Sequence, residues 1–255
     1  MGIFLPPSPL NVHISAKNAI LVPDPYRRLC TWLLMFIHLT KVRPMKLYYH
    51  PLSTYSQKVL IACYEKGIAF EPHVINVSNP KERAAFRGIY PLGKIPLVVT
   101  EDQRLIPESS IIIEYFDQAF PNSPDLIPKD PEQARQVRFR DRMHDLYLND
   151  PIVALLFESR KPEAEQDFPL IHKSRHTLNV LYEFLNNQIN NHSWSNGEQF
   201  SMADCAAAPA LFYAQRIYPF AKYPNIKAYF SRLMGHPAYR KVIKEAEPLV
   251  KKFLG

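Results

Sequence analysis

Apolar and polar positions follow a regular period from residue 45 onward, and the period changes along the chain. Residues 46–50 (KLYYH) have the short aromatic run of a β-strand. Residues 56–67 have helical periodicity that ends at Gly67, with an apolar face of Val59, Leu60, Ala62 and Cys63. Later segments predict a strand at 71–77, a helix at 79–88, a hairpin at 95–106 and a helix at 107–120. The order β-α-β-α-β-β-α predicts a small mixed-sheet domain over residues 45–121.

The rest of the chain is predicted to be helical. Residues 122–130 are rich in proline and have no period, so we interpret them as a linker. Residues 131–255 then show helical patterns only: a long amphipathic helix at 131–157, helices at 168–189 and 201–217, and two short helices over 223–250. The fold class is therefore α/β plus all-α, with a mixed-sheet domain followed by an all-helical domain.

The first 44 residues differ in composition and carry much of the positive charge. The net charge of the chain is +7, but residues 1–44 hold five Lys or Arg against one Asp, which leaves +3 for residues 45–255. The body has no aromatic-interleaved basic stripe, so we expect no nucleic-acid partner. The apolar run 29–39 is too short to span a bilayer, and we expect no membrane partner. Residues 1–44 are either an irregular leader upstream of a native start at Met45 or, less simply, a targeting segment.

The cysteine and histidine patterns indicate neither a disulfide framework nor a metal site. Cys30, Cys63 and Cys205 form no CxxC pair, which fits a reducing, cytoplasmic compartment. The nine histidines include no HExxH or close ligand pair, so no metal is expected.

Two short motifs in the first domain are candidates for ligand binding. Pro96 directly precedes a predicted strand, where a cis bond would turn the Ile95 backbone outward to bind an extended peptide; an ordinary trans proline ending a loop is the alternative. In PESSI, Glu108 and Ser109 precede an apolar helix, whose N-terminus suits a carboxylate while Glu108 suits an ammonium. A plain cap by Ser109 or Ser110 is the alternative here.

Four motifs in register resemble the cytosolic glutathione S-transferases. These are Ser53 with TYSQKV, the PLGKIP turn, ESSIIIEYF, and FSMADCAAAPAL, and they cover nearly all of residues 45–255. The resemblance implies a thioredoxin-like N-terminal domain, glutathione as co-substrate in a cleft beside the helical domain, and a homodimer. Where thioredoxin-like redox proteins carry Cys-x-x-Cys, this chain has Ser53-Thr54-Tyr55-Ser56, so the thiol must come from a bound partner.

The resemblance also implies roles for individual residues. Ser53 matches the catalytic serine of the theta- and zeta-like classes, with Ser56 and Tyr55 as runners-up. Lys94, Ile95 and Pro96 match the contacts to the glutathione backbone, and Glu108 and Ser109 match those to its γ-glutamyl end. The glycyl carboxylate needs a cation. Lys81 and Arg87 are both candidates, and either one can instead be a surface residue without this role. On the long helix, Arg142, Met143 and Tyr147 are candidates for the second-substrate wall or for the core.

The remaining motif is assigned to folding, and several activities stay open. Ser201 and Asp204 have capping-box spacing before an alanine-rich helix. The expected function is a transferase that adds the glutathione thiolate to a small hydrophobic electrophile. The alternatives are a glutathione-dependent isomerase of the maleylacetoacetate type, a dehalogenase, and a non-catalytic binding or regulatory protein with this fold.

Overall fold

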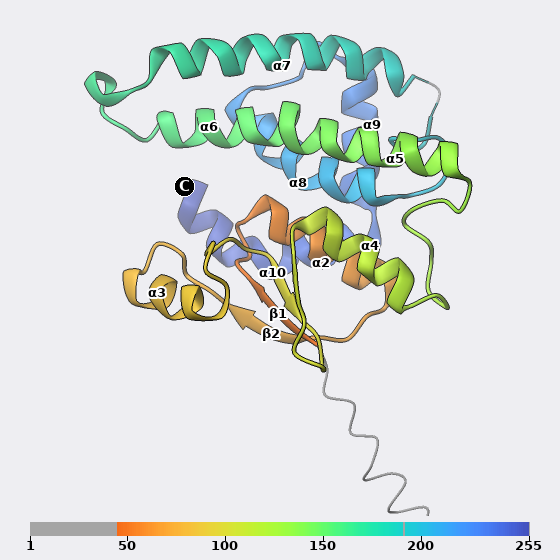
Figure 1. The fold of residues 1–255 in the computed structure, drawn as a ribbon. Coiled ribbons are helices and arrows are strands. Elements are labelled where there is room, and N and C mark those ends of the chain that lie inside the picture. Colours follow the sequence, from red (N-terminus) through yellow and green to blue (C-terminus); the bar gives the residue numbers. More distant parts are fainter. Residues whose placement is uncertain (1–44, 191, 255) are drawn as a thin grey trace, which may run out of the picture. The chain divides into compact units, whose positions relative to one another are not determined.

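The computed structural model describes residues 45–190 and 192–254 (Figure 1). The expected leader, with Cys30, lies outside the described residues. The chain forms β1 (Lys46–Tyr49), α2 (Thr54–Lys66), β2 (Glu71–Val74), α3 (Pro80–Ile89), β3 (Leu97–Val99), β4 (Leu105–Pro107) and α4 (Ser109–Ala119). This order confirms the predicted β-α-β-α-β-β-α pattern. The strands form one sheet in the order β2-β1-β3-β4, in which β1 and β2 are parallel and β3 is antiparallel to both neighbours.

Both faces of this sheet are covered by helices. Because side chains alternate along a strand, Leu47 and Val98 point to one face and join the main core with α2 and α4. Tyr48 and Leu97 point to the other face, where they pack against Phe86 of α3. Helix α2 ends at Gly67, whose left-handed backbone (φ 66°) makes the predicted helix stop. The sheet and its helices thus hold both ends of α2 in place.

The helical domain contains one departure from the sequence prediction. Its elements are α5 (Pro131–Met143), the π-helical turn η1 (His144–Asn149), α6 (Asp150–Glu158), the 3-10 turn η2 (Glu163–Glu165), α7 (Phe168–Gln188), α8 (Met202–Ile217), α9 (Pro224–Gly235) and α10 (Pro237–Leu254). The single long helix predicted over 131–157 is wrong, because η1 interrupts it. A π-helical turn holds more residues than an α-helical one, so it rotates every later side chain about the helix axis.

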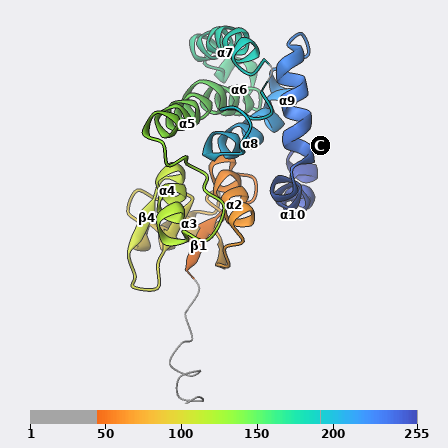
Figure 2. The ribbon, with the colours of Figure 1, turned by 90° about the vertical axis from the view of Figure 1, so that its right-hand side faces the viewer.

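Helix α8 is the centre of the helical domain and packs on α2 (Figure 2). Most of its residues between Met202 and Ala214 are buried, and many are alanines, whose small side chains permit close approach to α2. At its start, the Asp204 carboxylate accepts hydrogen bonds from the Ser201 amide (2.9 Å) and the Tyr229 hydroxyl (2.6 Å). The expected capping role of Ser201 and Asp204 is therefore present, and Asp204 also ties α8 to α9.

No helix among residues 45–190 and 192–254 is long and apolar enough to cross a lipid bilayer.

Candidate active site

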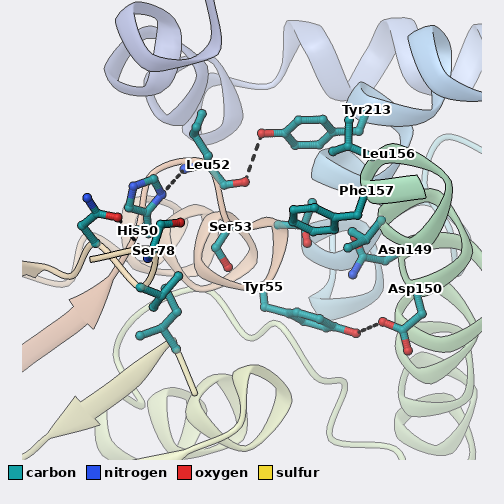
Figure 3. Close-up of a pocket in the computed structure, with 15 residues that line it drawn as sticks. His50, Leu52, Ser53, Tyr55, Ser78, Asn149, Asp150, Leu156, Phe157 and Tyr213 are labelled. Carbon is teal, nitrogen blue, oxygen red and sulfur yellow. Dashed lines mark hydrogen bonds between the residues drawn. The ribbon is translucent and has the colours of Figure 1, made fainter. Parts of the chain in front are cut away.

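A cavity of about 300 Å³ lies at the N-terminus of α2, between the sheet domain and the helical domain (Figure 3). The β1–α2 and β2–α3 loops form one side, and η1, α6 and α8 form the other. Its lining residues are His50, Leu52, Ser53, Thr54, Tyr55, Asn76, Val77, Ser78, Ile95, Asn149, Asp150, Val153, Leu156, Phe157 and Tyr213.

Ser53 is the N-cap of α2, and its hydroxyl hydrogen is available to the cavity. The Ser53 Oγ accepts a hydrogen bond from the Ser56 amide (3.3 Å), and it donates none to another described residue. The first amides of the helix, at Thr54 and Tyr55, have no carbonyl before them in the helix to bond to. A hydroxyl donor and a helix N-terminus therefore meet at the same point of the cavity, which favours a negative charge there.

The hydroxyls of the two runners-up to Ser53 are less well placed, because that of Tyr55 is bonded to another residue and that of Ser56 lies outside the cavity lining. The Tyr55 hydroxyl donates to the Asp150 carboxylate at 2.6 Å, and burial together with this bond raises the Tyr55 pKa. Ser56 is fully buried, does not line the cavity, and accepts a hydrogen bond from the His50 amide at 3.3 Å. Of these three hydroxyls, only that of Ser53 reaches the cavity with its hydrogen uncommitted.

The register of the β3–β4 hairpin brings the two predicted ligand motifs together. The Ile95–Pro96 bond is cis and not the trans alternative, and Ile95 lines the cavity. Leu97 pairs with Pro107 across the hairpin. Pro96, which precedes Leu97, and Glu108, which follows Pro107, therefore lie at the same end of the sheet. The predicted peptide-binding edge and the predicted α-amino-acid site are thus neighbours.

Glu108 and Ser109 stand at the start of α4 without a capping role. Glu108 has a left-handed backbone (φ 67°), which a non-glycine residue adopts at a cost of roughly 1–3 kcal/mol. The helix has no side-chain cap, and Ser110 is engaged with Lys58 and Asp141 instead. The structure therefore shows no side-chain cap from Ser109 or Ser110 at this helix N-terminus. Neither Glu108 nor Ser109 lines the cavity itself, and Ser109 is buried.

The predicted cations do not reach this cavity. Lys94 is exposed and does not line it, although it precedes Ile95, which does. Lys81 and Arg87 are exposed on α3 and do not line it either. The polar side chains that the β2–α3 loop contributes are those of Asn76 and Ser78, which the sequence analysis missed.

The predicted wall residues on the long helix also lie elsewhere. Arg142 pairs with Asp145 at 3.2 Å, whereas Met143 and Tyr147 line a separate groove with residues of α7. The wall is formed instead by Asn149, Asp150, Val153, Leu156 and Phe157. An uninterrupted helix was assumed when the wall was predicted, and nothing in the residue pattern marks η1, so its rotation of the later side chains was missed.

The described residues match one protein family over both parts of the fold. The N-terminal domain of glutathione S-transferases matches residues 47–124, and the C-terminal domain of the same family matches residues 148–237. The chain belongs to the glutathione S-transferase family. This confirms the predicted thioredoxin-like domain followed by a helical domain, and the chain is an enzyme of the transferase family.

Individual relatives are similar at moderate identity. Glutathione S-transferase U10 of Arabidopsis thaliana is 31% identical over 52% of this chain and 55% of its own length. The maleylacetoacetate isomerase of Pseudomonas aeruginosa is 25% identical over 80% of this chain and 98% of its own length. A glutathione S-transferase from Methylobacillus flagellatus, solved with GSH bound, superposes with a TM-score of 0.70 at 28% identity, covering 78% of this chain and 98% of that one.

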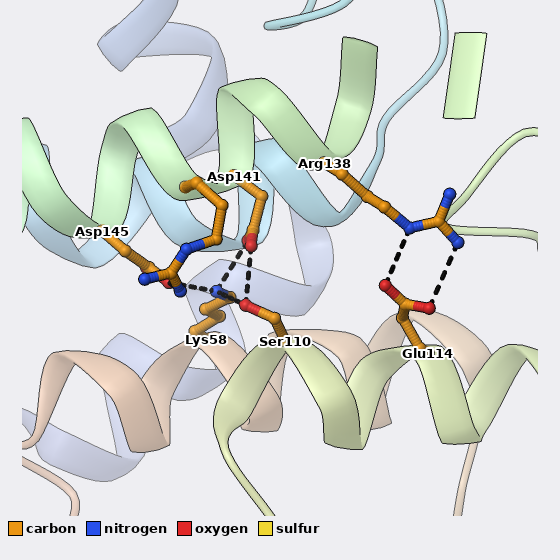
Figure 4. Close-up of polar contacts among 7 residues, drawn as sticks. Lys58, Ser110, Glu114, Arg138, Asp141 and Asp145 are labelled. Atoms are coloured by element: carbon orange, nitrogen blue, oxygen red, sulfur yellow. Dashed lines mark hydrogen bonds and ion pairs between the residues drawn. The ribbon is translucent and has the colours of Figure 1, made fainter. Parts of the chain in front are cut away.

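A buried ionic network holds the two domains of this transferase together (Figure 4). Lys58 of α2 is 1% exposed and contacts Asp141 (2.6 Å), Asp145 (2.8 Å) and the Ser110 hydroxyl (2.9 Å). Burial raises the pKa of Asp145 to about 6, against the lowering effect of the Lys58 ammonium. Lys58 lies just over one turn after Ser53, and Asp145 lies one short turn before Asn149. The network therefore fixes the two walls of the cavity relative to each other.

Among the described residues, no group of three or more His, Cys, Asp or Glu is arranged to hold a metal ion. The two described cysteines, Cys63 and Cys205, are free and fully buried, and burial raises the pKa of both thiols. Neither thiol lines the cavity. The sulfur chemistry of the site therefore depends on the thiol of a ligand.

Proposed function

We propose that this transferase binds glutathione at the N-terminus of α2 and adds its thiolate to a small hydrophobic electrophile. The observation that carries the proposal is the uncommitted Ser53 hydroxyl, placed at the helix N-terminus and open to the cavity. A free thiol has a pKa near about 8.5, so at neutral pH only a few per cent is thiolate. A hydroxyl donor and the helix dipole both favour the anion, and each unit by which the pKa falls raises its population roughly tenfold.

The arrangement around Ser53 suits the other parts of glutathione. The backbone at Ile95, beside the cis bond to Pro96, offers an edge for the peptide. Glu108, whose carboxylate does not cap α4, suits the α-ammonium of the γ-glutamyl end. The uncapped start of α4 at Ser109 suits its α-carboxylate.

The other half of the cavity suits an apolar second substrate. Leu52, Val153, Leu156 and Phe157 line it, and the Tyr213 hydroxyl donates to the Leu52 carbonyl at 3.0 Å, so the tyrosine presents its ring. Burying an apolar ligand against such a wall contributes roughly 25 cal/mol per Å² of apolar surface removed from water. The substrate pocket is thus selective for size and hydrophobicity.

The isomerase alternative is supported by the similarity to a maleylacetoacetate isomerase, and it uses the same activated thiolate. A dehalogenase would release halide, and a non-catalytic protein would bind glutathione without turnover. The theta- or zeta-like class and a cytoplasmic location stay predictions of the sequence.

The test is a panel of aryl halides, epoxides, isothiocyanates and unsaturated carbonyls with glutathione. We expect conjugation of at least one, and Ser53→Ala should lower kcat by roughly ten- to a thousand-fold, the range for loss of one donor to an anion. Glutathione affinity should change less than threefold, because Ile95, Glu108 and Ser109 are untouched. Glutathione binding with no turnover of the panel, or full activity of Ser53→Ala, would contradict the proposal.

We also propose that the enzyme is a homodimer. Phe139, Tyr147, Val180 and Phe184 are each 41–57% exposed and line one groove on α5, η1 and α7, and contiguous apolar surface of this kind is typical of interfaces. Sedimentation velocity should show a dimer at micromolar concentration, and Val180→Glu should shift it toward monomer. The control is Leu249→Glu, since Leu249 is 37% exposed on α10 away from the groove. A wild-type monomer would contradict the proposal.

A further inference from the structure

Asn149 is a buried amide without a partner in the wall of the active-site cavity. It is the last residue of η1 and is only 2% exposed, and neither its Oδ1 nor its Nδ2 makes a hydrogen bond within the described residues. It lines the cavity together with Ser53 (Figure 3). Buried polar side chains in native proteins are almost always paired, so an unpaired amide facing a cavity points to a ligand group.

The backbone at Asn149 gives a second, independent indication. Turns of π-helix are rare and occur frequently at functional sites. Here the turn His144–Asn149 brings Asn149 and Asp150 to the cavity, whereas Leu146 and Tyr147, earlier in the same turn, are exposed away from it. The irregular turn thus supplies a polar group to the site.

The neighbours of Asn149 leave its amide hydrogens available. The Tyr55 hydroxyl already donates to Asp150 at 2.6 Å. A polar contact of the Asn149 amide with the Tyr55 oxygen opposes the rise in the Tyr55 pKa, and it occupies at most one of the two amide hydrogens. The adjacent wall is apolar, through Val153, Leu156 and Phe157. A hydrogen bond donated there is strengthened by the low local dielectric. Because the Asp150 carboxylate stands on the same wall, a substrate that arrives uncharged is preferred to one that is already an anion. The Asn149 amide is then the donor that offsets the carboxylate when negative charge develops on the substrate.

We propose that the Asn149 Nδ2–H donates to the carbonyl oxygen of an α,β-unsaturated aldehyde or ketone, which makes conjugate acceptors the preferred electrophiles. This inference rests on the proposed function. The glutathione thiolate forms the S–C bond at the β-carbon, and the C=C electron pair shifts toward the carbonyl, so the oxygen gains the negative charge of an enolate. Asn149 stabilises that charge, and a proton from water then restores the carbonyl compound. A donor preorganised toward developing charge accelerates the step that creates it.

Aralkyl halides provide the matched comparison, because in their reaction with the thiolate the negative charge develops on the departing halide ion and not on a carbonyl oxygen. At saturating glutathione, kcat/KM is measured with trans-2-hexenal and with benzyl chloride. Asn149→Leu keeps the volume and removes the amide, so the hexenal to benzyl chloride ratio should fall ten- to a hundredfold. The control Gln215→Leu makes the same amide-to-leucine change at an exposed position of α8 that does not line the cavity, and its ratio should stay within threefold of wild type.

The outcomes separate this inference from the proposed function. An unchanged ratio in Asn149→Leu, with glutathione affinity and melting temperature retained, overturns the inference and leaves the transferase standing. A wild-type enzyme that conjugates benzyl chloride but not hexenal also overturns the inference and leaves the proposed transferase activity standing. If Asn149→Leu does not fold, Asn149→Asp keeps the shape and removes both amide donors, and the same fall in ratio is required of it. Turnover of no electrophile overturns the proposed function and the inference with it.

Discussion

Four hydroxyl side chains, those of Ser53, Thr54, Tyr55 and Ser56, lie at the start of α2, and the hydrogen bonds of Ser53, Tyr55 and Ser56 distinguish their roles. Tyr55 donates to Asp150 at 2.6 Å, and Ser56 is fully buried beside the His50 amide. Ser53 only accepts, from the Ser56 amide at 3.3 Å. Ser56 therefore helps to orient Ser53 through its backbone, while its own side chain braces the loop that carries His50. The proposed catalytic role of Ser53 thus rests on its hydroxyl hydrogen, which is not donated to another described residue.

Asp204 is the most heavily bonded carboxylate at the start of α8, and its loss should destabilise the enzyme. It is fully buried and accepts from the Ser195 amide (2.7 Å), the Ser201 amide (2.9 Å) and the Tyr229 hydroxyl (2.6 Å). Asp204→Ala leaves these donors unpaired, so we expect a loss of about 3–5 kcal/mol in the free energy of unfolding, measured in urea.

The control for Asp204 is Tyr229→Phe, which removes one of these bonds and should cost about 1 kcal/mol. Equal, small losses for both variants would show that the carboxylate is not central to the packing of α8 on α9.

At the scale of elements, the π-helical turn η1 decides which side chains face the cavity. The turn at His144–Asn149 rotates α6 so that Val153, Leu156 and Phe157 line the cavity. Arg142 and Met143 precede the turn and face Asp145 and the α7 groove instead. The helical-domain wall of the cavity therefore depends on a local irregularity of the backbone.

The π-helical turn η1 also explains why the sequence did not predict which residues of the helical domain line the cavity. The strand and helix order of residues 45–120, the stop at Gly67 and the cap at Asp204 follow from period and capping chemistry, which are local. Ser53 was predicted from the family resemblance, and Ile95 and Glu108 also from their positions before a strand and a helix. Of these three, Ser53 and Ile95 line the cavity. Asn149 and Asp150 were missed because π- and α-helical turns have no distinct residue pattern, and one turn changes which side chains share a face.

At the scale of the whole described body, Lys58 and its partners join the sheet domain to the helical domain. Lys58 comes from α2, Ser110 from α4, Asp141 from α5 and Asp145 from η1 (Figure 4). Removing one member of such a buried cluster typically costs about 3–5 kcal/mol, because an uncompensated charge remains. By contrast, Glu114 and Arg138 join α4 and α5 at the surface, with a separation of 2.8 Å.

The buried carboxyl group of Asp145 gives the enzyme a specific dependence of stability on pH. Burial raises the pKa of Asp145 from 3.8 to about 6, so the folded state holds a proton that the unfolded state releases. The stability contributed by this group is present below pH 4 and is lost as the pH rises through about 6. In urea titrations from pH 4 to pH 7, wild-type stability should fall relative to that of Asp145→Asn between pH 4 and pH 6.

Glu114→Gln is the control for this titration, because it alters a partly exposed ion pair between the same two domains. Its difference from wild type should be within about 1 kcal/mol and nearly independent of pH. A constant difference between Asp145→Asn and wild type across the range, or one of opposite sign, would contradict the account of the network.

The central claim is that Ser53 lowers the thiol pKa of bound glutathione, and the most direct measurement is the ultraviolet absorbance of the bound thiolate against pH. In wild type, bound glutathione should titrate at least one unit below the free thiol. In Ser53→Ala the midpoint should return toward about 8.5, whereas Tyr55→Phe and Ser56→Ala should leave it near the wild-type value. A midpoint that stays in place in Ser53→Ala but moves in Tyr55→Phe would show that a different hydroxyl activates the sulfur.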